Sequence, residues 1–132
     1  MMTVMFAMGL GVMGAPTRFA EIKVATGATD QQFGMALTMT AVGGLIGTWL
    51  APRIAHRTST KALVGWAGVT MILAAGAEGS ATNVFQLTLA CVIVGCAYTS
   101  VNIGINAQGV DLERHIKRSI MPSMHATWSA GA

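Results

Sequence analysis

Residues 79–110 read GSATNVFQLTLACVIVGCAYTSVNIGINAQGV, and this stretch of sequence decides the class of fold. Its 32 residues include no Asp, Glu, Lys or Arg. A helix needs roughly 17–25 predominantly apolar residues to cross the hydrocarbon core of a bilayer. A helix on the surface of a soluble protein would show a polar stripe, which this stretch lacks. The stretch therefore predicts a transmembrane helix.

Three further stretches also lack charged side chains, namely residues 1–17, 31–52 and 62–77. The whole chain of 132 residues is 53% hydrophobic, but only 10% of it is charged. Soluble domains average about 25% charged residues, and disordered chains lack this apolar content. We therefore expect an all-α membrane protein with four transmembrane helices and the start of a fifth. The expected helices cover about residues 1–25, 30–54, 61–78, 84–110 and 122–132.

Polar residues and glycines between these stretches predict where the helices begin and end. The first stretch is short for a span, so its helix either continues past Arg18 toward Val24 or has its start missing, and Gly27-Ala28 ends it. Ser, Thr or Asn followed three residues later by Gln is typical of a helix N-terminus, and Pro fits the first turn. The predicted starts of the later helices are Thr29 with Gln32, Ser59 or Thr60, Asn83 with Gln86, and Pro122.

Small residues such as glycine and cysteine let transmembrane helices pack closely. Gly43 and Gly47 form a GxxxG pair, which indicates either close packing inside one bundle or a dimerisation face. Cys91 and Cys96 lie on different sides of a helix, so we expect packing residues rather than a disulfide or a metal pair. The other glycines on the expected helices are Gly65, Gly68, Gly76, Gly95 and Gly104.

The cations are distributed unequally among the loops between the expected helices. We therefore interpret the net charge of +3 as a sign of membrane topology and not of nucleic-acid binding. Loops with excess Lys and Arg stay in the cytoplasm. Six cations lie in the second and fourth loops and two in the first, which predicts a cytoplasmic N-terminus. The six are Arg53, Arg57, Lys61, Arg114, Lys117 and Arg118, and the two are Arg18 and Lys23.

Three polar residues of the fourth expected helix share one face, because Tyr98, Asn102 and Asn106 recur every four residues. Uncharged polar groups in a bilayer turn inward, toward another helix or toward a cavity. This face therefore either forms hydrogen bonds between helices or lines a pathway for a polar solute.

Two ionisable residues near helix ends are also candidates for a functional role. Arg18 is either a functional cation or the partner of Glu21 in a local ion pair. His125 either titrates in a physiological range or is satisfied at the membrane interface. The sequence contains no pattern of a hydrolytic triad, a phosphate-cradling loop or a zinc site, so we do not expect an enzyme, a cofactor or a metal.

Three segments together resemble the N-terminal half of the major facilitator superfamily of secondary transporters. The likeness is closest to the bacterial branch of fucose-permease-like sugar transporters and their poorly characterised inner-membrane relatives. The segments are residues 18–34 (RFAEIKVATGATDQQFG), 50–61 (LAPRIAHRTSTK), and 102–114 with 120–131 (NIGINAQGVDLER and IMPSMHATWSAG). His56, Ser59 and Ala20 depart from the family pattern, which usually has Asp, Gly and Pro there.

The resemblance implies transport of a small solute, such as a sugar, across the bacterial inner membrane by alternating access, driven by an ion gradient as in a symporter. Each half of such a transporter has six helices in two inverted repeats. The resemblance therefore implies that this chain is a fragment whose partners are the lipid bilayer, the solute and the missing remainder of the transporter. The stop at Ala132, inside an apolar run, fits a fragment.

The resemblance also assigns roles to residues. It places Asn102, Tyr98 and Asn106 beside the substrate and Arg18 at the outer mouth. It implies a cytoplasmic gate, with His125 as a possible coupling residue. The gate residues are Arg53, Arg57, Lys61, Glu113 and Arg114.

Two other classes of membrane protein remain open. A small four-helix multidrug exporter acting as a dimer fits the length and the GxxxG pair, but residues 1–16 contain no acidic residue for proton exchange. A non-transporting membrane scaffold is the other alternative.

Overall fold

The computed structural model describes residues 1–14 and 16–132, which form helices joined by short turns. The elements are α1 (Met2–Gly14), the 3-10 helix η1 (Pro16–Arg18), α2 (Phe19–Thr26), α3 (Asp30–Arg57), α4 (Thr60–Gly79), α5 (Val84–Ile116) and α6 (Met121–Gly131). Strands are absent from the part of the chain that is described.

Within residues 1–14 and 16–132, three helices are long and apolar enough to cross a membrane, namely α3, α4 and α5. The helices α1 and α6 have 13 and 11 residues and fall short of a full span. The sequence predicts four spans, whereas the described part of the structure contains three candidate spans.

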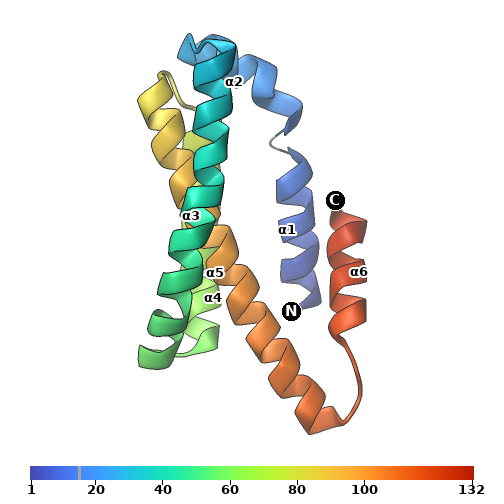
Figure 1. Cartoon of the computed structure of the whole chain (residues 1–132). Coiled ribbons are helices and arrows are strands. Elements are labelled where there is room, and N and C mark those ends of the chain that lie inside the picture. The colour runs from blue at the N-terminus through green and yellow to red at the C-terminus, as the bar shows by residue number, and fades with distance from the viewer. Residues whose placement is uncertain (15) are drawn as a thin grey trace.

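The prediction of a single first helix over residues 1–25 is wrong. The 3-10 helix η1 separates α1 from α2, which is a helix of its own. Pro16 lacks an amide hydrogen and its ring clashes with the preceding turn, so a regular helix breaks at this residue. Figure 1 shows α2 leaning away from the axis of α1 and crossing over to the start of α3.

The helix ends follow the local signals of the sequence. The Thr29 hydroxyl accepts the backbone N–H of Gln32 at 3.2 Å, and the Gln32 side chain accepts the N–H of Thr29 at 3.0 Å, so the predicted capping box is confirmed. The Ser59 hydroxyl and the Asn83 side-chain oxygen cap α4 and α5 by accepting the backbone N–H groups of Ala62 and Gln86. Gly27 ends α2 with φ of 62°, in the left-handed region that favours glycine.

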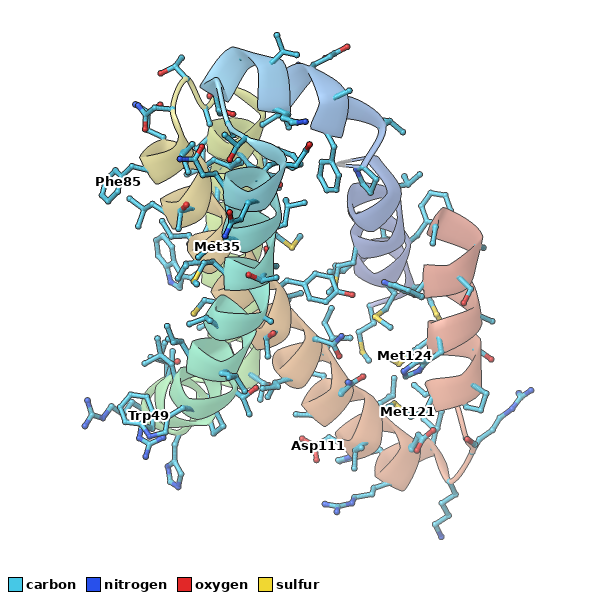
Figure 2. The ribbon with its side chains drawn as sticks, turned by 45° about the horizontal axis from the view of Figure 1, so that its top comes forward. Met35, Trp49, Phe85, Asp111, Met121 and Met124 are labelled. Atoms are coloured by element: carbon cyan, nitrogen blue, oxygen red, sulfur yellow. The ribbon has the colours of Figure 1, made fainter. Side chains whose placement is uncertain are left out.

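Successive long helices run in opposite directions (Figure 1). The long helix α5 packs along both α3 and α4, whereas α3 and α4 make few contacts with each other. The N-terminal helix α1 packs against α6, so the two ends of the chain form a second pair beside the bundle. Buried methionines, Met5 and Met8 of α1 and Met124 of α6, join this pair to Val101 and Ile105 of α5. Figure 2 shows Met121 and Met124 in the space between α5 and α6.

Glycine sets the distance between α3 and α5. A Cβ atom on Gly43 would overlap the backbone carbonyl of Val92, and one on Gly95 would overlap the carbonyl of Thr40. Gly47 lies against the backbone of Cys96 in the next turn. The GxxxG pair therefore packs inside the bundle, which confirms the first of its two interpretations.

The pair of α1 and α6 has the same crossing. A Cβ atom on Gly9 would overlap the carbonyl of Trp128, and one on Gly131 would overlap the carbonyl of Phe6. In both crossings each glycine faces the carbonyl of the residue three positions before the opposite glycine. The two helix pairs thus use one contact geometry twice.

The glycines of α4 behave differently. A Cβ atom on Gly65, Gly68 or Gly76 would meet no atom of the described residues within 4 Å. Close packing of these three glycines inside the bundle is therefore not seen. Gly104, in contrast, lies against Val64 of α4, as expected of a packing residue.

We expect Gly43→Ala to destabilise the bundle by about 1–3 kcal/mol, because the added methyl group must push two backbones apart. Gly68→Ala is the matched control, since its methyl group enters open space and alanine favours helix. Thermal unfolding of both variants in the same detergent measures the difference. Equal shifts of the unfolding temperature in both variants would contradict the packing role of Gly43.

Both strongly basic turns lie at one end of the molecule, because the α3–α4 turn and the α5–α6 turn are both at the foot of Figure 1, although on opposite sides. The α4–α5 turn lies at the other end. Excess cations mark the cytoplasmic side of a membrane protein. The arrangement in space is therefore consistent with the predicted topology, which stays a prediction.

We expect the variant Thr58→Cys in intact cells to resist a membrane-impermeant maleimide and Thr82→Cys to react with it. The reason is that Thr58 lies beside the basic α3–α4 turn, whereas Thr82 lies in the α4–α5 turn. The unmodified chain, with Cys91 buried and Cys96 half-buried, supplies the background. The reverse labelling pattern would overturn the topology.

Candidate functional site

The polar face of α5 is the strongest candidate site. Tyr98, Asn102 and Asn106 are all half-buried, and Tyr98 packs against the cluster that contains Val101 and Ile105. The Asn106 amide nitrogen donates a hydrogen bond of 2.7 Å to the side-chain oxygen of Asn102. This bond lies within α5. Among the described residues, hydrogen bonding between helices therefore does not account for the two asparagines.

One polar atom of this face has no partner. The side-chain oxygen of Asn106 is buried and accepts no hydrogen bond from the described residues. An unpaired buried polar group costs about 1–3 kcal/mol, so native proteins rarely keep one without a reason. The Gln108 amide nitrogen and the Trp128 indole nitrogen are unpaired in the same sense. A polar solute or water that reached the Asn106 oxygen would supply the hydrogen bond that this atom lacks.

Arg18 does not belong to this face. It lies in η1, at the end of the molecule where α2 crosses to α3 (Figure 1). Its Nε donates to the Glu21 carboxylate at 3.2 Å, and both side chains are mainly exposed. The local ion pair expected as one alternative is therefore present. Its guanidinium also lies near Gly79, where it faces the C-terminal end of α4.

The predicted gate residues fall into two separate groups. Arg53 lies 3.8 Å from the ring centroid of Trp49 in a cation–π contact and donates to the Trp49 carbonyl. No ion pair joins Arg53, Arg57 or Lys61 to a carboxylate within the described ranges. Arg114 lies 4.0 Å from Asp111, one turn back on its own helix.

Glu113 contacts the start of α6 rather than the other predicted gate residues. Its carboxylate accepts the backbone N–H groups of Ile120 and Met121 at 2.7 and 2.8 Å, and the Ser119 hydroxyl at 3.1 Å. It therefore holds the start of α6 against the end of α5 and is not paired with the other basic turn. A gate formed by these five residues stays a prediction.

The Nδ1 atom of the exposed His125 lies 3.0 Å from the Met121 carbonyl, one turn back on the same helix. Its role in coupling stays a prediction. A search of the described residues finds no group of three His, Cys, Asp or Glu side chains that could hold a metal ion.

The structure adds a residue that sequence reasoning missed. Glu78, in the last turn of α4, is only 8% exposed. No hydrogen bond or ion pair to its carboxylate is found among the residues described. An acidic residue beside Gly79 and Ser80 resembles the start of an exposed turn, so the sequence carried no signal of its burial. A buried acid near a membrane helix is a functional candidate.

The comparisons with known proteins are sparse. No family model matches the chain, and no solved structure matches it. Over 100 residues the chain is 26% identical to a protein of Sinorhizobium fredii (strain NBRC 101917 / NGR234) called "Uncharacterized transporter y4wD". The match covers 76% of this chain and 26% of that protein, so the chain spans about a quarter of its relative. The chain is therefore an all-helical, multi-pass membrane protein with similarity to a transporter.

Proposed function

We propose that the chain is part of a secondary transporter of the major facilitator superfamily that moves a small polar solute by alternating access. The single observation that carries the proposal is the polar face of α5, with its unpaired Asn106 oxygen in the C-terminal half of an apolar helix. The similarity to a transporter supports it. The bacterial inner membrane, a cytoplasmic N-terminus and coupling to an ion gradient complete the proposal.

The chemistry of this face favours a solute that carries hydroxyl groups. The asparagine amides offer both donors and acceptors, and Tyr98 adds one hydroxyl group on the same face. A hydroxyl group of a sugar-like solute would satisfy the unpaired Asn106 oxygen. Asparagine does not take up a proton, so a coupled proton would need a separate titratable group, and His125 is our candidate.

The alternative of a small dimeric exporter loses its main support. That interpretation used the GxxxG pair as a dimerisation face, and both glycines of the pair are buried against α5 of the same chain. The scaffold alternative differs from the proposal in having no uptake activity at all, so a transport assay separates them.

We expect Asn102→Ala in the complete transporter to lower the initial uptake rate about fivefold at low solute concentration, because one hydrogen bond worth about 1 kcal/mol is lost. A panel of radiolabelled monosaccharides in cells that express the protein provides the assay. The matched control is Ser100→Ala, because the Ser100 hydroxyl already donates to the Cys96 carbonyl at 2.8 Å. Unchanged uptake in Asn102→Ala at normal protein levels would refute the role of this face.

A further inference from the structure

An apolar groove lies on the side of the bundle opposite the polar face. It has a volume of about 330 Å³ and runs between α3 and α4, with α5 as its floor. Ile46, Leu50 and Ile54 follow one stripe of α3 along one wall, and Leu63 and Trp66 of α4 line the other. The groove exists because α3 and α4 each pack on α5 and make few contacts with each other.

The groove offers a ligand no free hydrogen-bonding group from its hydroxyl side chains. The Thr70 hydroxyl donates to the Trp66 carbonyl at 2.9 Å, and the Ser100 hydroxyl donates to the Cys96 carbonyl at 2.8 Å. The α3 wall from Ile46 to Ile54 is about 12 Å long at 1.5 Å per residue. These properties suit a flexible hydrocarbon chain rather than a polar solute.

The end of the groove nearest the α3–α4 turn is strongly basic. Arg57 lies three residues after Ile54 and continues the same stripe of α3. The N-terminus of α4, which carries the positive end of the helix dipole, lies just beyond it with Lys61 in the first turn. Arg57 is exposed, and neither it nor Lys61 has a carboxylate partner in the part of the chain described.

Two acidic residues of the other basic turn are already engaged. Glu113 binds the start of α6, and Asp111 lies beside Arg114. The cations at the α3–α4 turn therefore have no carboxylate partner among the described residues and can pair with an anion from outside them. Trp49, labelled in Figure 2 near this end of α3, is the kind of residue that lies at the level of lipid headgroups.

We propose that this groove binds an anionic phospholipid, with one acyl chain along α3 and α4 and the phosphate at Arg57 and the N-terminus of α4. A ligand with an apolar tail and an anionic head matches the two parts of the site, which an acidic protein segment would not. The site lies on the other side of α5 from Asn102, so this inference does not depend on the proposed solute pathway.

The test uses Trp66, an exposed residue on the α4 wall of the groove, as a fluorescent reporter. The variant Trp49→Phe with Trp128→Phe leaves Trp66 as the tryptophan whose fluorescence is measured. The protein is placed in phosphatidylcholine vesicles that contain a small fraction of either phosphatidylglycerol or phosphatidylcholine with brominated acyl chains. Bromine quenches tryptophan on contact, so we expect quenching by the brominated phosphatidylglycerol to exceed random mixing by about fivefold.

Two charge variants locate the headgroup site. Arg57→Gln should reduce the quenching to the level seen with brominated phosphatidylcholine, and Arg57→Lys should retain most of the preference. Arg118→Gln removes the same charge from the other basic turn at the same end and should leave the preference intact. Inorganic phosphate should not reverse the quenching, because it lacks the acyl chain that fills the groove.

Three results would overturn the proposal. Equal quenching by the two brominated lipids would show that no anionic lipid is selected. Equal losses in Arg57→Gln and Arg118→Gln would show diffuse attraction to the basic end. Reversal by inorganic phosphate would show an anion site that does not use the groove.

Discussion

The contact between the backbones of α3 and α5 at Gly43 and Gly95 is the constraint on which the rest of the structure depends. Lipid tails are as apolar as leucine, so the hydrophobic effect does not drive helices together inside a bilayer. Instead, the close approach of the two helices at glycine provides dispersion contacts along their backbones. Once α3 and α5 are fixed at this distance, Cys91 is completely buried and the polar face of α5 must turn toward α1 and α6.

The same contact explains why the molecule has two faces with different chemistry. The side of α5 that meets α3 and α4 carries Cys96, Ala97 and Ser100, and these small residues leave the groove beside them open. The opposite side carries Tyr98 and the two asparagines. One helix thereby separates an apolar surface suited to lipid from a polar surface suited to a solute, and neither surface needs a residue of the other.

The features that the sequence predicted well are those that depend on neighbours within one turn. The caps at Thr29 and Asn83 follow from side chains that reach backbone N–H groups three residues away. Features that depend on which helices meet were not predictable in the same way. The burial of Glu78 and the engagement of Glu113 with α6 depend on contacts between elements. Nor could the sequence distinguish Gly43, which packs, from Gly68, which faces open space. For the site, periodicity placed three polar residues on one face, but it did not show which of their atoms lack partners.

The pairing of α1 with α6 has a consequence for the order in which the chain can assemble. The helices α3, α4 and α5 meet partners that follow closely in the sequence, whereas α1 packs on a helix made more than a hundred residues later. At the usual rate of synthesis that interval is on the order of ten seconds. During this time Gly9 of α1 lacks the helix against which it packs in the described structure, so α1 depends on a chaperone or on the insertion machinery.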